Sequence, residues 1–204
     1  MPSKKMPDEP AKSAGPDGRA APPSDLNQLT AAEAALAICQ NVLRGIGESD
    51  LDKPTPCSSF TIGELADHLI GSMVGLGGMA GAAVIPAESG TVESRVAFAA
   101  QQALDAWQGR GLEGTVKLGD SDMPAGGAAS ILSLELLIHA WDFAVATGQQ
   151  VDVSDQVAHY VLDLARQVIQ PQGRQDGAFA AAIEVGPDAD ILDRLIAFSG
   201  RAVT

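Results

Sequence analysis

The sequence predicts an all-α protein, a helical bundle with short extra helices and a small β-hairpin. Three observations support this fold class. Four long segments repeat apolar residues at spacings of three and four, which is the pattern of one buried helix face. The connections between these segments are short and mostly polar, as in bundles. No alternation of strand and helix patterns indicates a parallel sheet.

The composition fits one globular domain with an acidic surface. Of the 204 residues, 46% are hydrophobic and 19% are charged, which is enough apolar material for a sizeable core. The formal net charge of -13 argues against a nucleic-acid partner, because an acidic surface repels phosphates. Two cysteines are no disulfide framework, and we expect both to be reduced.

The domain is expected to follow a disordered tail. Residues 1–24 are rich in Pro, Ala and Gly with little to bury, whereas residues 25–204 carry the helical patterns. Lys4 and Lys5 are followed by no apolar run, so we expect no secretory signal. The uncharged stretch 69–86 is glycine-rich and too short to span a membrane, which requires about 20 apolar residues. A cytoplasmic protein without a membrane partner is therefore expected.

The first two helices carry capping signals. The first helix is expected to begin near Asp25 or at Thr30, since Thr30 and Glu33 have the spacing of a capping box. The second capping box, "TIGE" from Thr61, predicts a helix that continues to about Met79. The connecting segment "LDKPTPCSSF" is predicted to be a loop, because its prolines are incompatible with a helix interior.

The remaining elements follow from the same signals. The glycine-rich "GLGGMAG" loosely fits a dinucleotide-binding pattern, but a helix precedes it where that pattern needs a strand, so we interpret it as a frayed helix end. Gly148 is a suitable C-cap for the helix before it. The later elements are expected at 91–108 (helix), 114–119 (short strand or hairpin edge), 127–147 (helix), 154–169 (helix) and directly after Asp190 (short helix).

The helix predicted at 127–147 carries a carboxylate and an imidazole on one face. Glu135 and His139 are four residues apart, so they lie one above the other. Their neighbours are apolar, and an ionised glutamate in such surroundings is costly unless it is paired or bound to a metal. By itself, this spacing is more typical of an ion pair than of two metal ligands.

The second helix supplies a third candidate ligand. His68 is flanked by Leu65 and Leu69, and alone it would be interpreted as a hydrogen-bonded core histidine. However, two of the three histidines of the chain then lie on the inward faces of two bundle helices, where bundles build metal sites. We therefore predict a divalent metal on His68, Glu135 and His139. Three protein ligands leave a coordination position open, as in catalytic sites.

Three other side chains are candidates for lesser roles. Asp142 follows His139 by three residues and is a candidate partner that orients this imidazole, with a local structural role beside Trp141 as the alternative. Cys57 precedes a helix N-terminus, which lowers a thiol pKa, but no histidine is adjacent in sequence and we favour a structural role. We expect His159 to be half-buried and without a role at the site.

These residues carry a family likeness. The segments "DKPTPCSSFTIGELADHLIG" and "LELLIHAWDFAVATGQ" resemble the DinB-like superfamily. Within it, the chain is most similar to the metal-binding domain of the mycothiol-dependent maleylpyruvate isomerases, and "VGPDADILDRLIAFSGR" resembles the end of actinobacterial members. The likeness covers residues 25–201. It implies a DinB-like four-helix bundle with one divalent metal at the positions of His68, Glu135 and His139. Phe60 stands where the family usually has tryptophan.

The resemblance also implies a chemistry. It makes a low-molecular-weight thiol, mycothiol, the expected cosubstrate of a metal-dependent S-transferase or isomerase-like enzyme. Zinc is the metal expected first, and nickel, iron and manganese suit the same ligands. The family's isomerase has an extra C-terminal domain that helps to bind thiol and substrate, and we expect none here. The alternatives are a non-catalytic metal-binding or structural bundle, and a metal-free homodimer in which Glu135 pairs with a histidine.

Overall fold

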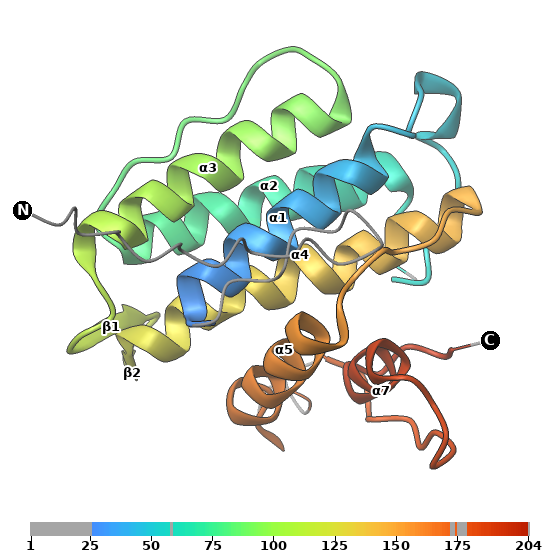
Figure 1. The fold of residues 1–204 in the computed structure, drawn as a ribbon. Helices are drawn as coiled ribbons and strands as arrows, with labels where there is room; N and C mark the ends of the chain where they lie inside the picture. The colour runs from blue at the N-terminus through green and yellow to red at the C-terminus, as the bar shows by residue number, and fades with distance from the viewer. Residues whose placement is uncertain (1–25, 58, 172–173, 175–178, 204) are drawn as a thin grey trace, which may run out of the picture.

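The structure, a computed structural model, describes residues 26–57, 59–171, 174 and 179–203. The tail expected at residues 1–24 lies outside this part of the chain. The described residues form a helical bundle with a small β-hairpin, and the predicted fold class is confirmed (Figure 1).

Four helices make up the bundle, and each packs against two others (Figure 1). Helix α1 contacts α3 and α4, and α2 likewise contacts α3 and α4. A short 3-10 helix, η1, lies in the connection from α1 to α2, and the last two described helices, α5 and α7, pack against each other beside α4. The bounds are α1 Gln28–Leu43, η1 Glu48–Asp50, α2 Ile62–Met79, α3 Val92–Arg110, α4 Ala125–Thr147, α5 Asp155–Val168 and α7 Ile191–Phe198.

Helix α1 begins at Gln28, between the two predicted starts near Asp25 and at Thr30. Its N-cap is Asn27, whose side-chain oxygen accepts hydrogen bonds from the backbone N–H groups of Leu29 and Thr30 at 2.9 and 3.1 Å. The Thr30 hydroxyl accepts the Asn27 N–H at 2.8 Å. Thr30 therefore closes the capping box from inside the helix. The difference has a physical reason, since asparagine is a stronger N-cap than threonine.

Helix α2 begins where the sequence predicted. The Glu64 carboxylate accepts the Thr61 N–H at 2.8 Å, and the Thr61 hydroxyl in turn accepts the Glu64 N–H at 3.4 Å. Its residues Leu65, Leu69 and Met73 are fully buried. This start and this buried face fix the direction in which His68, one residue before Leu69, leaves the helix.

Helix α4 is the most buried helix of the described chain. It is apolar on nearly all sides, and its length and composition would allow it to cross a membrane. However, 83% of its most apolar 18-residue stretch is buried inside the protein. Such burial is typical of a core helix, because a helix that is hydrophobic all round must be covered by protein or lipid. Gly148 ends α4 with a φ of 69°, as its position predicted.

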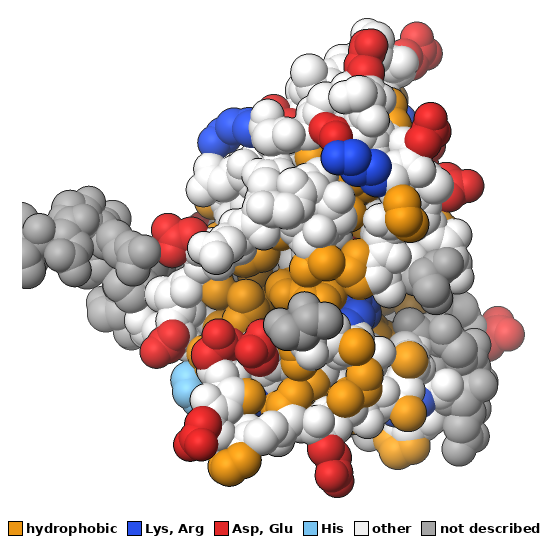
Figure 2. Space-filling view, turned by 90° about the vertical axis from the view of Figure 1, so that its right-hand side faces the viewer, with side chains coloured by type: hydrophobic (Ala, Val, Ile, Leu, Met, Phe, Trp, Pro, Cys, Tyr) orange, Lys and Arg blue, Asp and Glu red, His pale blue; other side chains and the backbone are white. Residues whose placement is uncertain are grey.

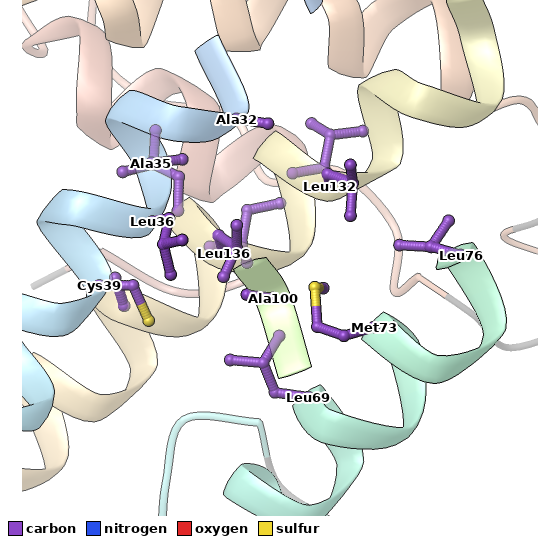
Figure 3. Packing of buried hydrophobic residues seen from close by; sticks show 14 of the residues in the cluster. Ala32, Ala35, Leu36, Cys39, Leu69, Met73, Leu76, Ala100, Leu132 and Leu136 are labelled. Carbon is purple, nitrogen blue, oxygen red and sulfur yellow. The ribbon is translucent and has the colours of Figure 1, made fainter. Parts of the chain in front are cut away.

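Small side chains let the helices approach each other closely. Figure 3 shows Ala32 and Ala35 of α1 beside Leu132 and Leu136 of α4, with Leu69 and Met73 of α2 directed into the same core. Trp107 of α3 is fully buried, and its indole N–H donates to the Leu76 carbonyl at 3.0 Å.

The predicted hairpin edge is a two-stranded antiparallel hairpin. Strand β1 (Thr115–Leu118) pairs with β2 (Ser121–Pro124), and Gly119 turns the chain with a φ of 59°. Arg110 at the end of α3 holds the base of the hairpin, with Nη2 donating to the Thr115 carbonyl at 2.9 Å. Because β2 leads directly into α4, the hairpin lies at the N-terminal end of this helix (Figure 1).

One face of the molecule is hollowed. Figure 2 shows hydrophobic side chains gathered in the centre of this face, with acidic side chains spread around them. The acidic side chains on this face lie toward solvent.

Candidate metal centre

The structure brings together the three predicted ligands from two helices. Glu135 and His139 lie one turn apart on α4, and His68 faces them from α2. The Nε2 atoms of His68 and His139 are each 3.7 Å from Oε2 of Glu135. The two imidazole rings meet edge to face, with their centroids 5.3 Å apart.

Their spacing suits a common ion. Two ligands bound about 2.1 Å from one ion at roughly tetrahedral angles lie about 3.4 Å from each other. The two distances of 3.7 Å are close to this value, and all candidate ligand atoms lie within 4.8 Å of one another. A small adjustment of side-chain rotamers would therefore bring the set to coordination distance.

The Glu135 carboxylate carries the clearest sign of a missing partner. Its Oε2 atom is buried and has no hydrogen-bond partner among the described residues. An unsatisfied buried acceptor costs about 1–3 kcal/mol, and more when it is charged. The two nearest cationic candidates are the imidazoles, which lie too far away for hydrogen bonds. A divalent cation between the three residues would satisfy this oxygen, so the donor set fits a metal.

The three candidate ligands differ in how deeply they lie. The side chain of His68 is 39% exposed, that of Glu135 is 17% exposed and that of His139 is 6% exposed. The prediction that His68 points inward is thus only partly right, because it lies at the edge of the bundle. A site with one ligand near solvent is accessible to small molecules.

His139 is oriented by a buried ion pair. Its Nδ1 lies 2.8 Å from Oδ2 of Asp142, which is fully buried. Arg201 holds the same carboxylate, with Nε donating to Oδ1 at 2.9 Å and Nη2 to Oδ2 at 2.8 Å. A carboxylate that accepts from Nδ1–H fixes the tautomer in which Nε2 carries the free lone pair. The orienting role that the sequence suggested for Asp142 therefore agrees with its position.

The electrostatics of this ion pair favour the charged forms. Burial alone would raise the pKa of the Asp142 carboxyl, but the hydrogen bonds from His139 and Arg201 outweigh it and hold the pKa below its usual value. Burial likewise works against the Arg201 charge, and the hydrogen bonds to Asp142 raise the pKa of its guanidinium nonetheless. The pair is therefore a fixed dipole behind His139.

Arg201 was missed in the sequence, and a glycine places it. Gly200 has a φ of 93°, a conformation that other residues rarely adopt, and a Cβ there would meet Ala180 at 2.7 Å. This turn after α7 directs the chain back toward α4. The signal available in the sequence was a Gly–Arg pair that follows the closing helix, although nothing in it specifies Asp142 as the partner.

His68 is held by the loop before α2. Its ring stacks on Phe60, with centroids 4.9 Å apart and planes inclined by 23°. The loop is anchored by the Thr55 hydroxyl, which donates to the carbonyls of Phe60 at 2.8 Å and Cys57 at 3.0 Å. Burial is the main cause that lowers the pKa of His68, with the nearby His139 adding to it against the opposing effect of Glu135. A lowered pKa favours the neutral imidazole, which is the form that binds metals.

Cys57 belongs to a second set that could hold a metal, together with His139 and Asp142. That set is the weaker one. The Asp142 carboxylate already accepts hydrogen bonds from Arg201, and it occupies the Nδ1 side of His139. Burial raises the pKa of the Cys57 thiol, contrary to the lowering that its place before a helix suggested.

His159 belongs to neither of these two sets. The expectation that it is half-buried was wrong, because it is exposed on α5.

A cavity of about 510 Å³ opens in front of the site. His68, Glu135 and His139 line it together with Cys57 and Arg201. Its wall contains both polar and apolar groups, and its volume of about 510 Å³ is in the range of small-molecule sites, which is about 300–1,000 Å³.

The comparisons with known proteins place the chain in a family. It is 33% identical over 166 residues to Uncharacterized protein MT0763 and to Uncharacterized protein Rv0738, both of Mycobacterium tuberculosis. The match covers 79% of this chain and 91% of either relative. The chain belongs to the family of these two mycobacterial proteins. No family model matches the chain, and no solved structure matches it. Both relatives are actinobacterial, as the resemblance led us to expect.

Proposed function

We propose that this chain is a DinB-like protein that binds one divalent metal through His68, Glu135 and His139 and uses it to activate a small-molecule thiol. One observation carries the proposal. The buried Oε2 of Glu135 lies equidistant from two imidazole nitrogens and has no hydrogen-bond partner among the described residues. Two nitrogens and one oxygen favour zinc, and nickel, iron and manganese suit the same set.

The side chains around the ligands would prepare the site. Asp142 and Arg201 hold the His139 ring in one orientation, and Phe60 supports the His68 ring from the other side. This rigidity lowers the cost of binding, because the ligands need little rearrangement. A bound divalent ion would supply Lewis acidity and lower the pKa of a coordinated thiol or water, which provides a nucleophile at neutral pH.

The cavity supports a thiol cosubstrate. It exposes the ligand side chains of His68 and Glu135 together with Ser59 and Arg201, so a polar molecule can approach the candidate metal position directly. By resemblance to the mycothiol-dependent isomerases, the thiol would be mycothiol and the reaction a transfer or isomerisation in the cytoplasm. The protein's part would be to orient the thiol and to limit the access of water.

A structural metal is the second candidate function. The three ligands come from α2 and α4, so an ion between them would hold these two helices together without any catalysis. The exposed edge at His68 and the cavity in front of it favour the catalytic function, because structural zinc sites are usually closed.

Two measurements test the proposal in sequence. Elemental analysis of protein purified without chelators should find one divalent metal per chain, and the Glu135→Gln variant should lack it. The metal-loaded protein is then incubated with mycothiol and an electrophile. Loss of free thiol that requires both the metal and Glu135 supports the transferase function. Bound metal without thiol turnover supports the structural function, and a chain without metal contradicts both.

A further inference from the structure

Glu135 lies between two cavities of different character. The first is the polar cavity described above. The second, of about 350 Å³, lies on the side of α4 that faces the β-hairpin, and Glu135 lines both. Ser72 of α2 lines the second cavity beside it. Glu135 therefore borders both cavities, whereas His68 and His139 line only the first.

The second cavity is mostly apolar. Its apolar lining comes from Leu76 and Met79 of α2, Ile131 of α4 and Leu118 of the hairpin. Leu118 is 48% exposed, so the cavity is open on the side of the hairpin. The only cation among the residues that line it is Lys117, which is paired with Asp122 at 2.9 Å. Apart from Lys117, Ser72 and Glu135, the side chains of this wall are apolar.

Gly75 keeps the cavity open. It lies on α2 and lines the cavity together with Ile131, and a Cβ added at Gly75 would meet nothing within 4 Å. Glycine in a helix interior destabilises it by about 1 kcal/mol relative to alanine. Side chains larger than hydrogen would project into this space. The glycine-rich segment "GLGGMAG" therefore contributes Gly75 to the wall of this cavity.

We infer that the second cavity binds the aliphatic part of the substrate, while the polar reacting group of the same molecule lies at Glu135 and the metal. The inference rests on the proposed function, and it names the substrate class, which is a small electrophile with an alkyl chain. The inference is supported by the contact between the two cavities, because Glu135 lines both and joins the apolar wall to the other candidate ligands. The polar cavity would remain for the thiol.

Binding should depend on chain length. Each methylene buried against this wall contributes about fourfold in affinity. The probes are alkyl hydroxamates from two to eight carbons, whose head group binds metal ions. With zinc-loaded protein, the dissociation constant should fall about fourfold per added methylene until the cavity is full. Acetohydroxamate provides the reference for the head group alone.

Gly75→Leu and Gly71→Leu form a matched pair of variants. Both positions are exposed on α2 with open space around the missing Cβ, and both gain the same helix propensity, so both variants should fold. Gly75 lines the cavity and Gly71 does not. Gly75→Leu should abolish the dependence on chain length while acetohydroxamate still binds. Gly71→Leu should retain it.

A second measurement separates this inference from the metal. The neutral probes 1-octanol and ethanol are titrated into chelator-treated protein, and backbone amide shifts are followed by NMR. 1-Octanol should shift Leu118 and Ile131, and ethanol should not, even without a metal. If zinc fails to bind but these shifts occur, the proposed function falls and the apolar site stands.

Four results would overturn the inference. One is an equal affinity for all hydroxamates in the wild type, and another is an unchanged dependence on chain length in Gly75→Leu. The third is a 1-octanol titration without shifts at Leu118 and Ile131. The fourth is a dimer, detected by sedimentation, that covers the hairpin face and closes the cavity.

Discussion

Arg201 and Asp142 are 59 residues apart in the sequence, and they form a buried, doubly hydrogen-bonded ion pair behind the candidate metal centre. The carboxylate is fully buried and the arginine side chain is 12% exposed. Because Asp142 also contacts His139, this pair couples the end of the chain to the site. Its contribution can be measured separately from any metal.

Replacing Arg201 by Met should destabilise the protein by about 3–5 kcal/mol, because Asp142 is left as a buried carboxylate without its cation. The measurement is urea unfolding in the presence of chelator. Adding Asp142→Asn to the same chain should recover most of the loss, since the stranded charge is then gone. The stability of Arg201→Lys should lie between those of the wild type and Arg201→Met, because lysine keeps the positive charge but cannot make both hydrogen bonds. A loss below about 1 kcal/mol would show that the pair behaves like an exposed one.

Replacing Glu135 by Gln should separate the charge of this residue from its shape. Loss of a residue that only orients a metal ligand lowers metal affinity by roughly 10–100-fold. Because Glu135 is itself a candidate ligand, we expect its replacement to lower metal affinity by more than this. Without metal, the variant should be no less stable than the wild type, since the buried charge without a partner is removed. His139→Ala should also lose the metal but keep Glu135 stranded, so its metal-free form should be the less stable of the two variants.

Three melting curves, each with and without chelator, check these expectations. For the wild type, free metal at 100 times its dissociation constant should add about 2.7 kcal/mol of stability, and the chelator should remove it. Neither variant should respond to the chelator. The metal-free wild type provides the reference for both variants. A metal-free Glu135→Gln protein that melts well below this reference would contradict the stranded-charge argument.

Cys39 should make the protein sensitive to alkaline pH. Burial raises the pKa of its thiol from 9.0 to about 12, so the unfolded chain loses this proton first as the pH rises. The unfolded state is then favoured, and stability should fall by about 1.4 kcal/mol per pH unit between these two values. Cys39→Ala removes this contribution, so the stability difference between the two proteins should change with that slope above pH 9.0 and stay constant below it. Parallel stability curves across this range would contradict the prediction.

Because Asn27 is the N-cap of α1, replacing it should weaken the start of this helix. Asn27→Ala should cost about 1 kcal/mol, because two backbone N–H groups lose their acceptor, whereas Asn27→Gly should cost only a few tenths. Thermal unfolding in the presence of chelator measures both. If Thr30 were the true N-cap, Asn27→Ala would have no effect.

Local patterns were enough to predict the elements that carry the ligands. The spacing of four residues between Glu135 and His139, and the capping box at Thr61, determine where these side chains lie on α4 and α2. Both signals act within a few turns of one helix, so they can be read without knowing the tertiary structure. The convergence of His68 with the α4 pair followed from the apolar faces of the two helices.

Contacts between distant segments were not predictable in this way. The pairing of Arg201 with Asp142 depends on the turn at Gly200 and on how α7 packs, and neither leaves a periodic pattern. His159 shows the converse, because we expected it to be half-buried in a helix and α5 presents it to solvent. The apolar cavity beside Glu135 likewise depends on how the hairpin closes against α2.

Calorimetric titration of zinc into chelator-treated, dialysed protein tests the central claim most directly. We predict saturable binding of one zinc ion per chain in the wild type, with binding lost in both Glu135→Gln and His139→Ala. Heats without saturation in the wild type, or equal binding in all three proteins, would show that His68, Glu135 and His139 do not form a metal site.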